Sequence, residues 1–262
     1  MNMSIDDWIK LSPDRTETCE THGTYQSKNV FGQIWTQCPR CDQIASEAEK
    51  ALHEEKSRAK EFEVWQQKIS GSGIPLRFQN RALSSFTANT PAQRYALEFS
   101  TRYADAFDEV LKTGRCALFV GKPGTGKTHL AAGIGLRIMR QHNRRVLFTT
   151  VMRAMRGIKS TWRHGSDETE NEAIAHLVLP DLLILDEVGV QYGSETEGLI
   201  LFDILNERYE NRRPTLLLSN LGLDEVRKYL GVRVFDRLRE DGGEAVPFDW
   251  ESHRGQITKT GA

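Results

Sequence analysis

The sequence predicts an α/β fold in which helices cover both faces of a parallel sheet, preceded by a small cysteine- and histidine-containing module and a connecting helix. Short apolar runs at 116–120, 146–149, 182–185 and 215–219 alternate with helical patterns, which is typical of repeated β-α units. The run at 182–185 is fully apolar, as expected of a strand buried in a parallel sheet. The segment 46–69 is rich in helix-forming residues and contains no glycine or proline.

The charge balance and the distribution of apolar residues exclude some classes of protein. The chain has 262 residues, with 35 basic and 36 acidic side chains and a net charge of -1. This balance argues against a uniformly basic nucleic-acid binder, although it does not exclude a local basic patch. No apolar run approaches the roughly 18 to 20 residues that span a bilayer. The N-terminus carries Asp6 and Asp7 and lacks the apolar stretch of a signal peptide, so we expect a cytoplasmic protein without a membrane partner.

Three segments follow one another along the chain. We expect a metal-binding module at 1–45, a connecting helix and linker at 46–73, and a nucleotide-binding domain at 74–262. The boundary at 73 rests on Ser70, Gly71, Ser72 and Gly73, which break the helix. In the third segment, we expect one helix to begin after Thr90 and to end at Gly114.

A glycine-rich loop lies between an apolar strand and a helix. Gly121, four further residues, Gly126, Lys127 and Thr128 have the spacing of a phosphate-binding loop. In such a loop the backbone N–H groups cradle the phosphates of ATP, the lysine reaches the β- and γ-phosphates, and the threonine hydroxyl binds Mg²⁺. The predicted nucleotide-binding residues are Gly121, Lys122, Pro123, Gly124, Thr125, Gly126, Lys127, Thr128, His129 and Asp186.

Two acidic residues follow the apolar run at 182–185. Ligands of open parallel sheets bind at the carboxyl ends of the strands, where Asp186 and Glu187 are expected. We expect Asp186 to hold Mg²⁺ together with Thr128, and Glu187 to orient and deprotonate the attacking water. The sequence therefore predicts an ATPase.

The N-terminal segment carries two pairs of candidate metal ligands. Cys19 and His22 form one pair and Cys38 and Cys41 the other, with fifteen residues between the pairs. Two pairs at this spacing can supply the four tetrahedral ligands of Zn²⁺. A segment this short and polar would depend on the metal for its stability. The zinc module could serve as a structural staple alone, or could contact DNA or a partner protein.

The motifs GKPGTGKTHLA and LLILDEVG together resemble the AAA+ superfamily and, within it, the DnaC-type helicase loaders and their close relatives. The segments 74–86, 216–220, 231–239 and 249–254 are also similar to this family, so the resemblance covers roughly 74–258. It implies that Asn220 is the sensor 1 residue, Arg237 the arginine finger and Arg254 the sensor 2 residue. A solvated helix face is the competing interpretation of Arg237. Because few residues follow Arg254, we expect no full helical lid, and ATP hydrolysis that is weak and stimulated by assembly or DNA.

The resemblance also implies partners. It indicates an ATP-dependent loader that binds the hexameric replicative helicase, self-associates into a ring or spiral, and places the helicase on single-stranded DNA. The alternative is an IstB-like transposition helper ATPase that acts on duplex DNA. A basic helix favours DNA contact, although an ordinary solvated helix would have the same pattern. Its residues are Arg153, Arg156, Lys159 and Arg163; Tyr192 and Ser194 are further candidate DNA contacts.

Overall fold

The structure, a computed structural model, describes residues 14–31, 34–190 and 195–253. Arg254, Tyr192 and Ser194 lie outside the described residues. The chain divides between Gln66 and Gln67 into two units, which are treated separately below. No described helix is long and apolar enough to cross a membrane.

The first unit contains two small antiparallel sheets. One is the hairpin of β1 (Arg15–Cys19) and β2 (Gly23–Ser27), and the other pairs β3 (Asn29–Phe31) with β4 (Ile34–Trp35). In the described part of this unit, only Ser27, Asn29 and Cys38 are buried. Strands this short with so few buried side chains have almost no apolar core to stabilise them.

The helix α1 covers Pro39–Gly71 and therefore begins earlier than the sequence indicated. It ends where the glycine and serine residues were expected to break it. Gly73 has a φ of +69°, and a Cβ atom there would lie 2.3 Å from the carbonyl oxygen of Phe148. In addition, the N–H of Phe148 donates a backbone hydrogen bond of 2.7 Å to the carbonyl of Ser72. Residues 72 and 73 thus lie directly against strand β6.

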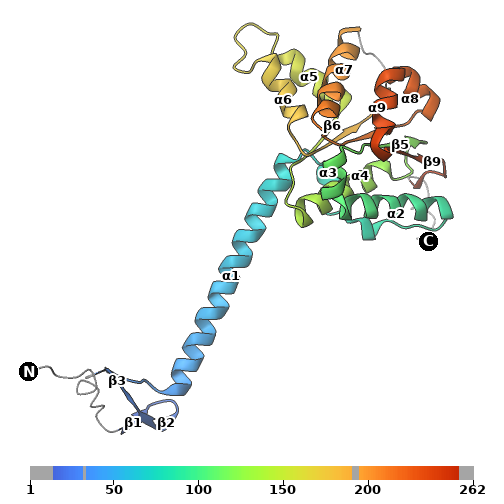
Figure 1. The fold of residues 1–262 in the computed structure, drawn as a ribbon. Coiled ribbons are helices and arrows are strands. Elements are labelled where there is room, and N and C mark those ends of the chain that lie inside the picture. Colours follow the sequence, from blue (N-terminus) through green and yellow to red (C-terminus); the bar gives the residue numbers. More distant parts are fainter. Residues whose placement is uncertain (1–13, 32–33, 191–194, 254–262) are drawn as a thin grey trace, which may run out of the picture. The chain divides into compact units, whose positions relative to one another are not determined.

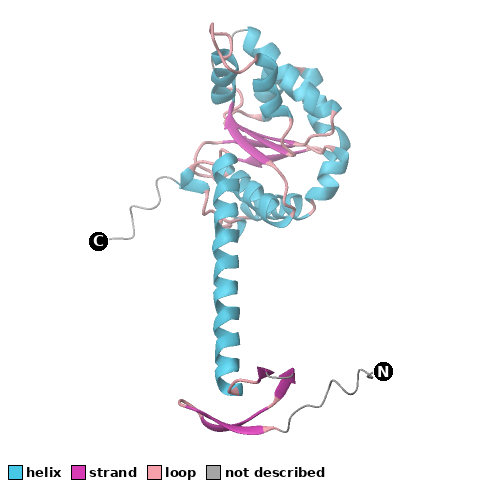
Figure 2. Ribbon diagram, turned by 90° about the vertical axis from the view of Figure 1, so that its left-hand side faces the viewer, coloured by secondary structure: helices cyan, strands magenta, loops and turns pink. Residues whose placement is uncertain are grey.

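The second unit is built on a five-stranded parallel sheet with the order β6-β7-β8-β5-β9. Figure 2 shows helices on both sides of this sheet. The strands are β5 (Ala117–Gly121), β6 (Val146–Thr150), β7 (Leu182–Asp186), β8 (Thr215–Ser219) and β9 (Glu244–Phe248). The predicted α/β fold with a helix-covered parallel sheet is confirmed.

The helices form two groups (Figure 1). On one face α4 (Lys127–Gln141) packs against β6, β7 and β8, and α2 (Pro91–Asp105) packs against α4 and β9. On the other face a continuous apolar cluster joins the sheet to further helices. These are α5 (Val151–Ser160), α6 (Glu170–Val178), α7 (Glu195–Glu210), α8 (Leu223–Leu230) and α9 (Val232–Arg239). Short 3₁₀ turns cover Leu76–Phe78, Leu83–Ser85 and Glu240–Gly242.

The helix expected between Thr90 and Gly114 is two helices. Thr90 caps α2 through a hydrogen bond from the N–H of Gln93, as the capping prediction required. The chain then leaves helical geometry at Ala106, with φ of -96° and ψ of 25°, and α3 (Phe107–Thr113) follows. Gly114 ends α3 in the left-handed conformation, with φ of +77°.

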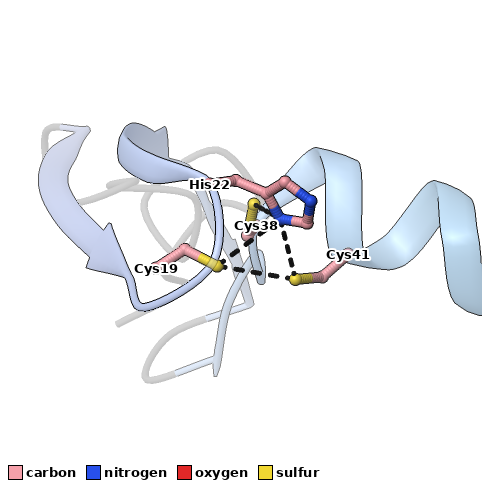
Figure 3. A group of neighbouring side chains, drawn as sticks. All are labelled: Cys19, His22, Cys38 and Cys41. Atoms are coloured by element: carbon pink, nitrogen blue, oxygen red, sulfur yellow. Dashed lines mark hydrogen bonds between the residues drawn. The ribbon is translucent and has the colours of Figure 1, made fainter.

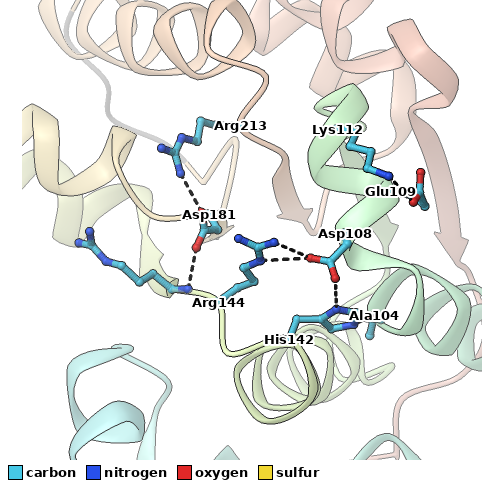
Figure 4. Close-up of polar contacts among 9 residues, drawn as sticks. Ala104, Asp108, Glu109, Lys112, His142, Arg144, Asp181 and Arg213 are labelled. Atoms are coloured by element: carbon cyan, nitrogen blue, oxygen red, sulfur yellow. Dashed lines mark hydrogen bonds and ion pairs between the residues drawn. The ribbon is translucent and has the colours of Figure 1, made fainter.

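Hydrogen bonds and ion pairs join the segments that precede the strands of the sheet (Figure 4). Asp181 accepts hydrogen bonds of 2.9 Å from the Arg213 side chain and from the N–H of Arg145. Asp108 accepts hydrogen bonds from Arg144 (2.7 Å) and His142 (3.1 Å). The hydrogen bonds from Arg144 and then from His142 lower the pKa of Asp108.

One charged side chain inside this unit, that of Arg208, has no acidic partner at hydrogen-bond distance among the described residues. Arg208 is fully buried, and its guanidinium donates to Thr215 Oγ1 and to four backbone carbonyls at 2.6–3.0 Å. Three of these carbonyls belong to the C-terminal end of α6 and the turn that follows, so Arg208 caps that helix. Burial lowers the pKa of Arg208 to about 9, so the group stays charged at neutral pH.

Candidate functional site

The predicted phosphate-binding loop connects β5 to α4 and has left-handed backbone at its glycines. Gly121, Gly124 and Gly126 have φ values of 128°, 77° and 101°. A Cβ atom on Gly121 would lie 2.3 Å from the carbonyl oxygen of Phe248, and one on Gly126 would lie 2.6 Å from the ring of Phe86. The glycines therefore serve both the backbone conformation and the close packing of the loop.

Three of the side chains predicted to bind nucleotide or Mg²⁺, those of Lys127, Thr128 and Asp186, lie close together at this loop. Lys127 is buried, and its Nζ donates hydrogen bonds of 2.7 Å to the carbonyls of Gly121 and Lys122. The Thr128 hydroxyl donates to Asp186 Oδ2 at 3.0 Å. These two oxygen-bearing side chains are adjacent, which fits a shared Mg²⁺ ion. Burial raises the pKa of Asp186.

A cavity of about 800 Å³ opens above the loop. It is lined by residues 123–129 together with Asp186, Glu187 and Asn220. Gly121 and Lys122 do not line it. Glu187 is exposed and has a φ of +62°, and its N–H donates to Asp186 Oδ1 at 2.7 Å. The predicted nucleophile-activating carboxylate and the predicted sensor thus face the same space as the phosphate-binding loop.

The sequence did not identify the other wall of the cavity. This wall consists of Arg77, Phe78, Arg81, Ser85, Phe86, Thr87 and His253. The segment 74–86 indicated only the family resemblance, although Arg77 next to Phe78, with Arg81 shortly after, was a usable signal. His129 Nε2 lies 3.1 Å from Ser85 Oγ and 3.3 Å from the carbonyl of Ala82, which ties the segment 74–86 to α4. Burial lowers the pKa of His129.

Arg237 does not line this cavity. It is in α9, where its guanidinium lies 4.8 Å from the centre of the Tyr209 ring. The Tyr209 hydroxyl donates to Glu240 at 2.5 Å. Arg237 lines a surface depression with Tyr209, Arg233, Asp236, Arg239 and Glu240. The structure therefore does not bring Arg237 to the nucleotide cavity of its own chain.

The four predicted zinc ligands converge in the first unit (Figure 3). The ligand atoms lie within 4.8 Å of one another; Cys41 Sγ is 3.5 Å from Cys19 Sγ and 3.3 Å from His22 Nδ1. Zinc bonds of about 2.3 Å to sulfur and about 2.0 Å to nitrogen imply tetrahedral edges of roughly 3.5 to 3.8 Å. The donor set and its spacing fit Zn²⁺.

Local structure explains why these four side chains meet. Cys19 ends β1, Gly23 begins β2 with a φ of +77°, and His22 lies in the tight turn between them. Cys38 precedes α1, and Cys41 lies in its first turn. Backbone hydrogen bonds from Thr21 and His22 lower the pKa of Cys19 to about 6, which favours the thiolate that binds metal.

The basic helix is α5, but it ends at Ser160, so Arg163 lies in the turn after the helix and not on the predicted helix face. Arg153, Arg156 and Arg163 are exposed, whereas Lys159 forms an ion pair with Glu197 of α7. Three of the four predicted basic side chains are thus exposed to solvent.

The fold and the site together define a P-loop ATPase of the AAA+ class. A family model described as "IstB-like ATP binding protein" matches residues 108–258, more than half of the chain. The chain belongs to this family.

Relatives and solved structures agree with the assignment. The replicative helicase loader DnaC of Escherichia coli (strain K12) is 36% identical over 195 residues, which is 74% of this chain and 77% of that protein. The uncharacterized protein YdaV of the same strain is 33% identical over 218 residues, 82% of this chain and 84% of that one. A crystal structure of the DnaC helicase loader is similar in fold, with a TM-score of 0.60 and 23% identity over 67% of this chain and all of that chain.

Proposed function

We propose that this protein is an ATP-dependent loader that binds the hexameric replicative helicase and places it on single-stranded DNA when replication begins. The observation that carries the proposal is the similarity to the replicative helicase loader DnaC, which extends over 77% of that protein. The cavity shared by Lys127, Asp186, Glu187 and Asn220 supports ATP as the ligand that controls loading. The protein would act in the cytoplasm.

The site residues have separate tasks in ATP hydrolysis. Lys127 binds the β- and γ-phosphates, Glu187 orients and deprotonates the attacking water, and Asn220 contacts the water or the γ-phosphate. Thr128 and Asp186 would hold Mg²⁺, which supplies positive charge at the phosphates when bound. Hydrolysis in the isolated chain would be weak, and assembly or DNA would stimulate it.

Arg237 would act on the ATP of a neighbouring subunit in a ring or spiral. Arg237 does not line the cavity of its own chain and lies instead in a surface depression, and both observations support this role. An arginine supplied by a neighbour completes the positive charge around the γ-phosphate. Arg254, the proposed sensor 2 residue, follows the described residue His253, which lines the cavity.

A mixing experiment tests this arrangement. Arg237→Ala and Glu187→Gln should each abolish stimulated ATP hydrolysis. An equal mixture of the two variants should recover part of the rate, because some interfaces combine an intact Glu187 with a neighbour's intact Arg237. Arg239→Ala, a change on the same helix, is the matched control and should retain activity. If the mixture is as inactive as its components, Arg237 does not act between subunits.

The first unit would recognise the helicase. We propose a Zn²⁺ module at 1–45, a connecting segment at 46–73 and the ATPase domain at 74–262. Apolar side chains are exposed along α1, among them Ile44, Leu52 and Phe62 at 50–63% exposure. Exposed apolar side chains on a helix of this length are typical of a surface that binds a partner.

The decisive experiment is native mass spectrometry of the full chain with the replicative helicase of its host. We expect a defined complex with ATP that persists with an analogue that cannot be hydrolysed. A chain without residues 1–66 should bind ATP but lose the complex, which would assign recognition to the first unit. The absence of a complex in every nucleotide state would contradict the loader proposal.

The second candidate function is an IstB-like transposition helper that acts on duplex DNA. The matching family description favours it, because that description names IstB-like ATP-binding proteins. It predicts ATP-dependent assembly on duplex DNA and binding to a transposase. The loader proposal instead predicts preference for single-stranded DNA, with Arg153, Arg156 and Arg163 as contacts, so comparing the two DNA forms by fluorescence anisotropy separates the candidates.

A further inference from the structure

The segment after β9 packs against the phosphate-binding loop, and we call residues 249–253 the strap. The strap makes two hydrogen bonds to the loop backbone. Trp250 Nε1 donates to the carbonyl of Thr125 at 3.0 Å, and the N–H of His253 donates to the carbonyl of Gly124 at 3.0 Å. Just before the strap, the carbonyl of Phe248 accepts a hydrogen bond of 2.9 Å from the N–H of Lys122.

We propose that the strap is part of the nucleotide site and that Trp250 is a positioning residue, which sets the direction of the N–H groups that bind the phosphates of ATP. The inference deepens the proposed function and rests on it only for the identity of the nucleotide.

The geometry of the peptide bond links these hydrogen bonds to the direction of the N–H groups in the loop. A trans peptide is planar, so its C=O and N–H groups point in opposite directions. The peptide whose carbonyl Trp250 binds carries the N–H of Gly126, and the peptide whose carbonyl His253 binds carries the N–H of Thr125. A hydrogen bond to either carbonyl therefore fixes the plane of that peptide and, with it, the direction of the matching N–H, which is a donor available to phosphate. Each such bond also polarises its peptide, which strengthens the N–H as a donor.

The loop needs this external support because its glycines do not fix their own conformation. Glycine populates left- and right-handed backbone almost equally, so a free glycine-rich loop would sample many states. The side chain of Thr125, only 1% exposed, provides one internal bond by donating to the carbonyl of Lys122 at 2.8 Å. The strap adds hydrogen bonds to the carbonyls of Gly124 and Thr125. Binding to a preformed loop avoids the entropy cost of ordering it.

Packing holds Trp250 in place. Its ring centre lies 4.8 Å from that of Phe248, which is fully buried and in turn lies 5.0 Å from Phe119 of β5. The ion pair between Lys122 and Glu251 at 3.4 Å is exposed and adds little. Stacking on Phe248 therefore holds the indole N–H toward the loop, and we expect nucleotide binding to change the surroundings of Trp250.

The test replaces Trp250 with phenylalanine, which keeps an aromatic ring on Phe248 and removes the N–H donor. Isothermal titration calorimetry on the full chain should show about three- to tenfold weaker binding of ADP and of an ATP analogue. In steady-state hydrolysis, the KM for ATP should rise by more than kcat falls. The matched control is Trp162→Phe, which removes an indole hydrogen bond of 2.8 Å to Glu170 away from the cavity and should leave nucleotide affinity unchanged.

Two further measurements, tryptophan fluorescence and hydrogen exchange, test the proposal even if Trp250→Phe folds poorly. Nucleotide should change the tryptophan fluorescence of the native protein and of Trp162→Phe, and this change should vanish in a folded Trp250→Phe. Hydrogen exchange of the unaltered protein should slow at His253 when ADP is added. Affinity within twofold of the native value in Trp250→Phe, or unchanged exchange at His253, would overturn the proposal. Neither experiment uses a helicase or DNA, so the loader proposal stands or falls separately.

Discussion

Removing one zinc ligand should unfold the first unit and leave the ATPase unit intact. The change is Cys38→Ser, at the only buried ligand of the four. Apart from Cys38, Ser27 and Asn29 are the buried residues in the described part of this unit, so apolar burial contributes little to its stability. A structural zinc ion contributes about 10–16 kcal/mol in small zinc-finger peptides, which far exceeds what two short hairpins can supply.

The assay measures zinc and structure together. We expect one zinc ion per native chain. A chelator should remove zinc from Cys38→Ser at a much lower concentration than from the native chain. Metal release should remove β-sheet signal in circular dichroism, while ADP affinity stays unchanged. Cys116→Ala is the matched control, because Cys116 is buried in the ATPase unit away from the cluster. The reasoning is refuted if the native chain purifies without zinc, or if Cys38→Ser retains as much zinc as Cys116→Ala.

The remaining predictions concern the ATPase unit. Arg208→Met should lower the free energy of unfolding by about 3 kcal/mol or more, measured by urea denaturation, because it leaves buried carbonyls without a donor; an unchanged midpoint would contradict this. Gly121→Ala should abolish ATP binding in calorimetry, since its φ of +128° and a contact of 2.3 Å exclude a Cβ atom, whereas Gly198→Ala, with open space around it, should bind normally. The hydrogen bonds from Arg144 and His142 lower the pKa of Asp108 below its ordinary 3.8, so their stabilisation is present above that pH and is lost as pH falls through the lowered value. Asp108→Asn should therefore flatten the loss of thermal stability in acid, and an acid profile identical to the native one would argue against this role.

Residues whose chemistry is local were predictable from the sequence. The glycine spacing around Lys127, the acidic pair after β7 and the paired zinc ligands each depend on a few neighbouring positions. The structure brings Thr128 and Asp186 together because Thr128 follows β5 and Asp186 ends β7, and these strands run parallel in one sheet. Capping at Thr90 was predictable for the same reason, since its partners lie within one turn.

Features that depend on distant parts of the chain were missed. Strand β9 contains Pro247 and a glutamate and has no long apolar run, so only its pairing with β5 identifies it. Helix α6 is short, and the buried Arg208 that caps it comes 30 residues after Val178. The strap could not be predicted because its hydrogen bonds join residues more than 120 positions apart, such as Trp250 and Thr125.

The contact between residues 72–73 and β6 has a consequence for solubility. Strand β6 is an edge of the sheet, and an edge strand offers unpaired N–H and C=O groups on which another chain can add a strand. Here the N–H of Phe148 already donates to Ser72, and Gly73 lies too close to this strand to leave room for a foreign backbone. A chain shortened to begin after residue 73 would uncover that edge, and we expect it to aggregate at concentrations at which a chain beginning at Gln67 stays dispersed.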